Sequence, residues 1–179
     1  MKDPGSGPFL FDTSAERWLA RQHDPAVAKW FNDYLSRHTV NVSAVTVMER
    51  IRGYALLWHE TQPDLRMAVE LARIEYLTLL GTVWPIDTRI AVVAAEIMAL
   101  IPHPPPATNA PRLATESQHE RMARWRFNVV IAATALVAGM TLIHNNADDF
   151  ETIRSAIERS PQRFPKLGPL DLIRCVSLA

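Results

Sequence analysis

The sequence predicts an α/β fold in which helices cover both faces of a central, mostly parallel sheet of four to five strands. Short apolar segments alternate along the chain with longer segments of helical periodicity. Alternating strands and helices form parallel βαβ units, whose sheets are buried on both faces. With 179 residues and an apolar content of 48%, the chain can bury one sizeable core, so we expect residues 1–179 to form a single three-layer domain.

Five apolar or β-branched segments are the predicted strands. They are residues 8–12, 39–42, 82–86, 140–143 and 169–173. All five are short, and most are bounded by turn residues or helix caps, as is typical of strands in such a fold.

Seven segments with apolar residues at spacings of three and four are the predicted helices. Their expected caps or first residues are Ser14, Asp24-Pro25, Ser43, Pro63, Asp87, Ser117 and Phe150. The strongest signal is the capping box of Ser117 and Glu120, which opens a helix that we expect to end at Gly139. Gly81 is likewise expected to end a helix. Residues 102–111 contain five prolines, so we expect 102–116 to be an inserted loop.

The composition excludes several classes of protein. Charged residues make up 21% of the chain and the formal net charge is zero, so neither a disordered chain nor a strongly basic nucleic-acid-binding protein is indicated. Cys175 is the only cysteine and cannot form an internal disulfide, which fits the cytoplasm. The longest apolar run, 129–143, has 15 residues, whereas a membrane span needs roughly 20. We therefore expect a cytoplasmic protein with neither a membrane span nor a signal peptide.

Acidic residues fall where a parallel sheet gathers functional groups. Asp12 ends the first predicted strand and Asp149 follows the fourth, so both belong to the carboxyl edge of the sheet. Glu49 lies on a helix beside an apolar stripe that includes Met48, and Asn128 lies on the longest helix. Clustered carboxylates repel one another, and a hard cation such as Mg²⁺ or Mn²⁺ relieves the repulsion. The pattern predicts a divalent-metal site, although acids with this spacing also occur as structural caps.

Three segments, taken in order, resemble a known family. PFLFDTS, TVMERIRG and FNVVIAATALVAGMTLIHNNADDF resemble the PIN-domain family, and the closest type is the VapC-like toxin ribonucleases of bacterial toxin–antitoxin pairs. The resemblance extends over about residues 9–173, and the third segment is the most specific. It implies a PIN-like α/β/α fold and a Mg²⁺- or Mn²⁺-dependent endoribonuclease. It also implies RNA as the substrate, a cognate antitoxin as a partner, and a homodimer.

The resemblance assigns roles to particular positions. Asp12 and Glu49 match the first and second family acids, Asn128 stands where the third is expected, and the fourth is Asp149 or Asn146. Two further positions have expected contacts. Ser14 matches a small hydroxyl residue beside the first acid. Arg124 is expected either to contact RNA phosphates or to be part of a solvated face.

Asn128 is the departure from the family pattern that matters most. An amide keeps the shape of the carboxyl group but removes its charge, so metal binding is weakened. Either the asparagine was introduced to disarm a harmful ribonuclease, which the nearly intact motif favours, or the protein is naturally weakened. The chain is then an endoribonuclease of reduced activity or a catalytically inactive RNA- or protein-binding module. A different metal-dependent phosphohydrolase is disfavoured, since the common aspartyl-phosphate class has an acid where Ser14 stands.

Other polar residues near these positions have ordinary interpretations. His144 is expected to be a turn histidine beside the site, and Asp148 a solvated acid. Arg121 and Arg126 are expected to belong to a solvated helix face.

Overall fold

The computed structural model describes residues 3–20, 24–106 and 116–178. Within them, five strands form one sheet in the order β3-β2-β1-β4-β5, and every neighbouring pair is parallel. The strands are β1 (Phe9–Phe11), β2 (Val40–Ser43), β3 (Leu80–Trp84), β4 (Thr141–His144) and β5 (Leu172–Arg174). The predicted α/β class and parallel sheet are confirmed, and β1 occupies the central position.

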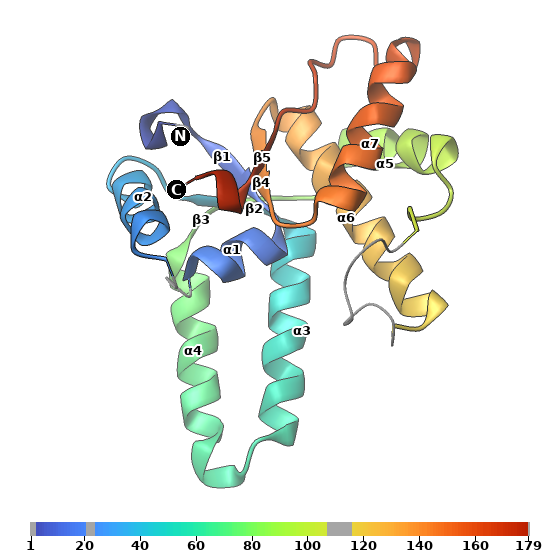
Figure 1. The fold of residues 1–179 in the computed structure, drawn as a ribbon. Helices are drawn as coiled ribbons and strands as arrows, with labels where there is room; N and C mark the ends of the chain where they lie inside the picture. The colour runs from blue at the N-terminus through green and yellow to red at the C-terminus, as the bar shows by residue number, and fades with distance from the viewer. Residues whose placement is uncertain (1–2, 21–23, 107–115, 179) are drawn as a thin grey trace.

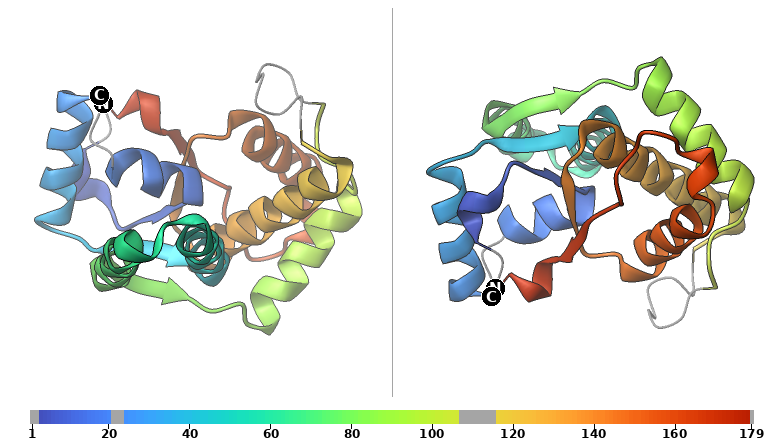
Figure 2. Two further views of the ribbon diagram at one scale, coloured as in Figure 1. Left: turned by 90° about the horizontal axis from the view of Figure 1, so that it is seen from below. Right: turned by 90° about the horizontal axis from the view of Figure 1, so that it is seen from above.

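Helices lie on both sides of this sheet (Figures 1 and 2). They are α1 (Thr13–Ala20), α2 (Pro25–Leu35), α3 (Ala44–Glu60), α4 (Arg66–Leu79), α5 (Thr88–Leu100), α6 (Gln118–Ala138) and α7 (Ala147–Arg159). Short 3-10 turns are η1 (Pro4–Ser6), η2 (Pro63–Leu65), η4 (Pro161–Arg163) and η5 (Cys175–Ser177). Helices α1 and α2 lie on one side and α5, α6 and α7 on the other, while α3 and α4 form a hairpin that projects away from the sheet.

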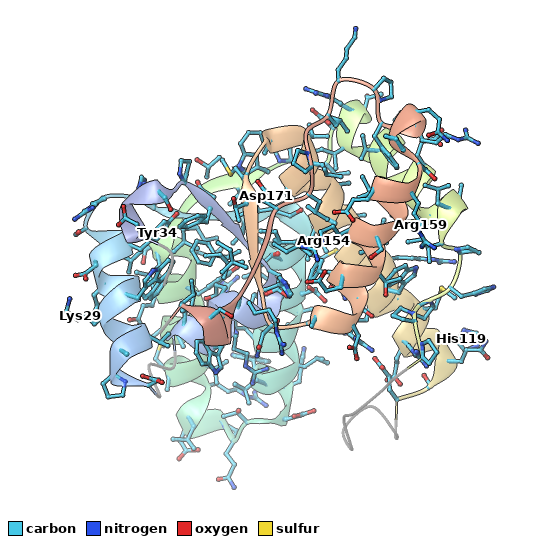
Figure 3. All side chains as sticks on the ribbon, turned by 45° about the horizontal axis from the view of Figure 1, so that its top comes forward. Lys29, Tyr34, His119, Arg154, Arg159 and Asp171 are labelled. Atoms are coloured by element: carbon cyan, nitrogen blue, oxygen red, sulfur yellow. The ribbon has the colours of Figure 1, made fainter. Side chains whose placement is uncertain are left out.

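Each face of the sheet packs against its own apolar core, because successive side chains of a strand point to opposite faces. Leu10 of β1 packs in the core with α5, α6 and α7, whereas its neighbours Phe9 and Phe11 pack in the core with α1 and α2. Tyr34 of α2 stacks on Phe9 with 5.5 Å between ring centroids. Figure 3 shows Tyr34 directed toward the sheet and Lys29 of the same helix directed outward.

Several predicted helix ends are confirmed. Ser117 and Glu120 form the capping box of α6, and Gly139 ends that helix with a φ of 65°. The side chains of Asp24 and Asp87 cap α2 and α5. Each cap satisfies backbone N–H groups that have no partner inside the helix.

Other boundaries differ from the prediction. Gly81 lies inside β3, where a Cβ would come within 2.0 Å of the Thr39 hydroxyl, so this glycine allows a close approach and does not end a helix. Helix α7 begins at Ala147, three residues before Phe150, because the Asn146 side chain caps it. Pro63 opens the turn η2, and α4 begins after it.

In the part of the chain that the structure describes, no helix combines the length and apolar content needed to cross a membrane. Most of the predicted proline-rich insertion, residues 107–115, lies outside the described residues. Residues 101–106 contain neither helix nor strand, as predicted.

Candidate functional site

The site lies at the carboxyl edge of the sheet. Asp12 follows β1 directly, and its backbone N–H donates to the Ile143 carbonyl of β4. Asn146 lies two residues beyond β4 and caps α7, which places Asp149 in the first turn of that helix. Helices α3 and α6 supply Glu49 and Asn128 from the flanking layers. The parallel sheet thus brings together residues that are far apart in the sequence.

Asp12 is buried, with only 3% of its surface exposed. Its carboxylate accepts hydrogen bonds from the Ala15 backbone N–H and from the Ser14 hydroxyl, at 2.8 Å for the nearer oxygen. Burial raises the pKa of Asp12 to about 7, and the neighbouring charge of Glu49 adds to the rise. Ser14 therefore lies inside α1 as a partner of Asp12, and the prediction that it caps the helix was wrong.

Glu49 lies on α3, within range for its charge to act on Asp12. Its carboxylate accepts a hydrogen bond from the Thr13 hydroxyl, which links α3 to the first turn of α1. Burial raises the pKa of Glu49, and Thr13 and the charge of Arg124 oppose this rise. The expected apolar stripe beside Glu49 is only partly buried, since Met48 is 50% exposed while Val45 is buried.

Asp149 lies in the first turn of α7 and is 6% exposed. One of its oxygens, Oδ2, accepts from Asn128 Nδ2 at 2.7 Å and from Asn146 Nδ2 at 2.8 Å. Arg124 Nη1 lies 3.3 Å from the same oxygen. The charge of Arg124 also lowers the pKa of Glu49, so Arg124 acts on both Asp149 and Glu49.

The donor set partly fits a divalent cation. Carboxylate and amide oxygens are the ligands that Mg²⁺ and Mn²⁺ prefer, and the raised pKa of Asp12 beside Glu49 is the behaviour of carboxyls that a cation would relieve. Asp149, however, already has three N–H partners on one oxygen. Among the described residues, no three acidic, histidine or cysteine side chains lie close enough to hold one metal ion. The fit is therefore good at Asp12 and Glu49, and at Asp149 it requires rearrangement.

Two polar partners of the site residues were not predicted from the sequence, and a third residue was misplaced. Thr13 and Glu116 touch predicted site residues, Glu49 and Arg124 respectively. The hydroxyl next to Asp12 in the DTS segment was a usable signal for Thr13. Glu116 gave none, because it precedes α6 and falls outside the helical spacing. His144 is the fully buried last residue of β4 and not a turn histidine, and burial lowers its pKa to about 4.

Solved structures of low sequence identity share this arrangement of elements. VapBC2 from Rickettsia felis, bound to a fragment of promoter DNA, matches over 93% of this chain and 97% of its own, with a TM-score of 0.58 and 11% identity. DNA-bound VapBC from Salmonella typhimurium matches over 93% and 97%, with a TM-score of 0.57 and 18% identity. The chain has a PIN-like fold. FitAcB from Neisseria gonorrhoeae matches this PIN-like chain over 82% of its length and 93% of the FitAcB chain, with a TM-score of 0.55 and 24% identity.

These matches confirm the PIN-like α/β fold that was expected from the three sequence segments. No family model and no curated protein matches the sequence. At these identities the likeness concerns the fold. The roles of individual residues in the PIN-like chain therefore depend on the geometry of its own pocket.

Proposed function

We propose that this chain is the toxin of a toxin–antitoxin pair and a divalent-metal-dependent endoribonuclease that hydrolyses RNA phosphodiester bonds. The observation that carries the proposal is the pair of carboxyls at Asp12 and Glu49, which separate elements bring close enough for the charge of Glu49 to raise the pKa of the buried Asp12. Its position at the carboxyl edge of a PIN-like sheet supports the same function.

Each carboxyl has a neighbour that fixes its orientation. Ser14 and the Ala15 N–H hold Asp12, and Thr13 holds Glu49. Asp12 and Glu49 would hold Mg²⁺ or Mn²⁺, with Asp149 and the carboxamide oxygens of Asn128 and Asn146 as further donors. When bound, the ion supplies an activated water and stabilises the charge that develops on the phosphodiester. Arg124 at the same pocket would contact an RNA phosphate.

The identity of residue 128 sets the expected level of activity. Asn128 donates an N–H to Asp149, whereas a carboxylate there would repel Asp149, and binding of a cation would relieve this repulsion. Asn128→Asp should therefore cleave a pool of structured RNAs in Mg²⁺ or Mn²⁺ faster than the unmodified chain. Asp12→Ala, in the same background, is the inactive control. Equal cleavage by Asn128→Asp and by that control would contradict the proposal.

A second candidate function is a catalytically inactive module that binds RNA or a protein. It is favoured by one observation: two hydrogen bonds and an ion pair satisfy Oδ2 of Asp149 without a metal ion. Codon 128 of the encoding gene distinguishes the two origins of the asparagine. An aspartate codon would mean that Asn128 was introduced, and an asparagine codon together with RNA binding but no cleavage would support the inactive module.

The helical hairpin supports the proposed antitoxin partner. Helices α3 and α4 and the turn between them expose large apolar side chains, namely Leu56, Leu57, Leu65, Met67, Leu71 and Ile74. An apolar surface of this kind commonly marks a protein interface, and the apolar face of an amphipathic helix would cover it. Leu71→Glu should then abolish co-purification with the protein encoded beside this gene while leaving the fold intact. A homodimer and a cytoplasmic location stay predictions, and sedimentation measurements would check the first.

A further inference from the structure

A surface groove lies between α5 and the segment that follows α7. It has a volume of about 650 Å³. One wall is formed by residues 88–96 of α5, and the other by residues 163–167, which begin at the last residue of η4. We call it the α5 groove. The second wall follows the C-terminal end of α7, which lies about 15 Å from Asp149 along the helix axis, so the groove is separate from the candidate site.

The floor of the α5 groove is apolar. Val93 and Phe164 line it and are 8% and 5% exposed, since both belong to the core beneath α5. Leu167 packs against the same core. Beside them Val92 is 57% exposed, although it is a large apolar residue. An apolar side chain of a partner could cover Val92 and extend this floor.

Three basic side chains line the same groove, namely Arg89, Arg163 and Lys166. Arg163 lies 3.4 Å from Glu96, the acidic residue of the lining. In the described part of the chain, no carboxylate lies within ion-pair distance of Arg89 or Lys166. Three basic residues and one acidic residue leave the groove with an excess of positive charge, although the formal net charge of the whole chain is zero.

The backbone of Lys166 is unusual at this position. Its φ is 71°, and no other residue in the described ranges except glycine has a positive φ. This left-handed conformation is unfavourable for a residue with a Cβ, whereas glycine adopts it freely. Residues held in such conformations cluster at binding sites. The fold therefore keeps a lysine at the groove where a glycine would be the more stable choice.

Charge and shape select among the possible occupants. A second copy of this chain that met the groove across a two-fold axis would bring Arg89 and Lys166 against the same cations of the other copy, and these would repel. Phe164, the aromatic residue of the lining, is buried, so its ring is not open for a nucleic-acid base to stack on. An acidic peptide that also carries apolar side chains would match both the floor and the cations.

We propose that the α5 groove binds a short acidic segment of a partner protein. Apolar side chains of the segment cover Val92 and the floor, and its carboxylates pair with Arg89 and Lys166. The proposal goes beyond the ribonuclease function and does not depend on it, because it involves neither a metal ion nor the candidate site.

A random peptide library displayed on phage tests the chemistry of the occupant. The library is selected on the unmodified chain and on Val92→Asp, which places a carboxylate beside the apolar floor. The unmodified chain should enrich peptides in which aspartate or glutamate flanks leucine or an aromatic residue, and Val92→Asp should fail to bind them. Because Val92 is exposed, this variant should fold, and circular dichroism checks that it does.

Fluorescence anisotropy with one selected peptide measures the contribution of the cations. Arg89→Gln combined with Lys166→Gln should weaken binding about tenfold, which corresponds to about threefold for each exposed charge. Lys29→Gln combined with Arg126→Gln is the matched control, because it removes the same charge from exposed positions on α2 and α6. This control should bind the peptide as the unmodified chain does.

Two single variants should act in less obvious directions. Glu96→Gln frees Arg163 from its carboxylate, so it should bind the peptide about threefold more tightly. Lys166→Gly relieves the left-handed backbone but removes a cation, so it should unfold at a higher temperature and yet bind the peptide more weakly. A purely structural role of Lys166 would leave peptide binding unchanged.

Several results would overturn the proposal. One is that the peptides lost by Val92→Asp are basic or uncharged, or that no selected peptide distinguishes this variant from the unmodified chain. Another is equal peptide binding by the two double variants. Self-association that Val92→Asp abolishes in sedimentation would assign the groove to a second copy. Binding of single-stranded RNA that only Arg89→Gln with Lys166→Gln weakens would assign it to nucleic acid. None of these results changes the expected cleavage by Asn128→Asp, so the two proposals fail separately.

Discussion

Replacing Asp12 with asparagine should stabilise the protein, and the gain should grow with pH. The Asp12 carboxyl is 3% exposed, and its pKa is raised from 3.8 to about 7, chiefly by burial. At 1.36 kcal/mol per pKa unit, this rise corresponds to about 4 kcal/mol of folding free energy. Asparagine has no charge to bury, yet its oxygen can still accept the hydrogen bonds from Ser14 and Ala15.

The direction of this change in stability with pH follows from the protons that the folded and unfolded states bind. Between pH 4 and 7 the folded protein keeps the Asp12 proton and the unfolded chain has lost it, so stability falls as the pH rises. The contribution is fully present below the unfolded pKa and is lost as the pH passes the folded pKa. The stability of Asp12→Asn relative to the unmodified chain should therefore increase by about 3 kcal/mol between pH 5 and pH 8.

Urea unfolding at several pH values, in the presence of a chelator, measures this difference. Ser14→Ala is a matched variant whose effect on stability should have the opposite sign, because it removes a donor that stabilises the charged form of Asp12. It should destabilise the protein more at pH 8 than at pH 5. A difference between Asp12→Asn and the unmodified chain that stays constant with pH would refute the reasoning, because it would mean that the folded Asp12 carboxyl is not destabilised by burial.

Two further predictions concern stability elsewhere in the fold. Arg50→Met should destabilise the protein by about 3 kcal/mol in urea unfolding, because it removes the cation that lies 3.0 Å from the buried Glu16 carboxylate. Adding Glu16→Gln should recover part of the loss, and no recovery would mean that Arg50 acts through packing. Gly139→Ala should cost about 1 kcal/mol because of the φ of 65°, whereas Gly53→Ala in α3 should stabilise the protein by about as much. Both positions have open space around an added Cβ, so thermal unfolding isolates the backbone effect, and shifts of the same sign would contradict it.

Local signals were sufficient for much of the fold. The capping box at Ser117 and the left-handed glycine at 139 depend on a few neighbouring residues, so the sequence contains all that decides them. Gly81 was misread because the reason for its small size, the side chain of Thr39, lies on the neighbouring strand. The start of α7 was misplaced since Asn146 is both a turn former and a helix cap, and periodicity cannot separate the two. The order of the strands in the sheet was not predicted.

The candidate site was likewise predictable where local position decides it, and unpredictable where contacts between distant segments decide it. Asp12 and Asp149 could be placed at one edge of the sheet because parallel topology decides where strands end. The contacts of Arg124 with Glu116 and Asp149 could not, because they depend on side-chain directions across three elements. The sequence therefore predicted the edge of the sheet to which Asp12 and Asp149 belong, and only the structure gives the hydrogen-bond partners of each carboxylate.

The two links between α1 and α3 have a mechanical consequence. Thr13 joins Glu49, and one turn further along α1, Glu16 joins the adjacent Arg50. These links anchor the sheet-proximal part of α3, while Glu60 at the far end of that helix lies about 16 Å beyond Glu49 along its axis. Helix α3 is thus held in place at its sheet-proximal end, and neither link restrains its far end. A partner that bends only the tip of the hairpin leaves the spacing of Asp12 and Glu49 nearly unchanged, so a partner that alters these two carboxyls has to contact them directly.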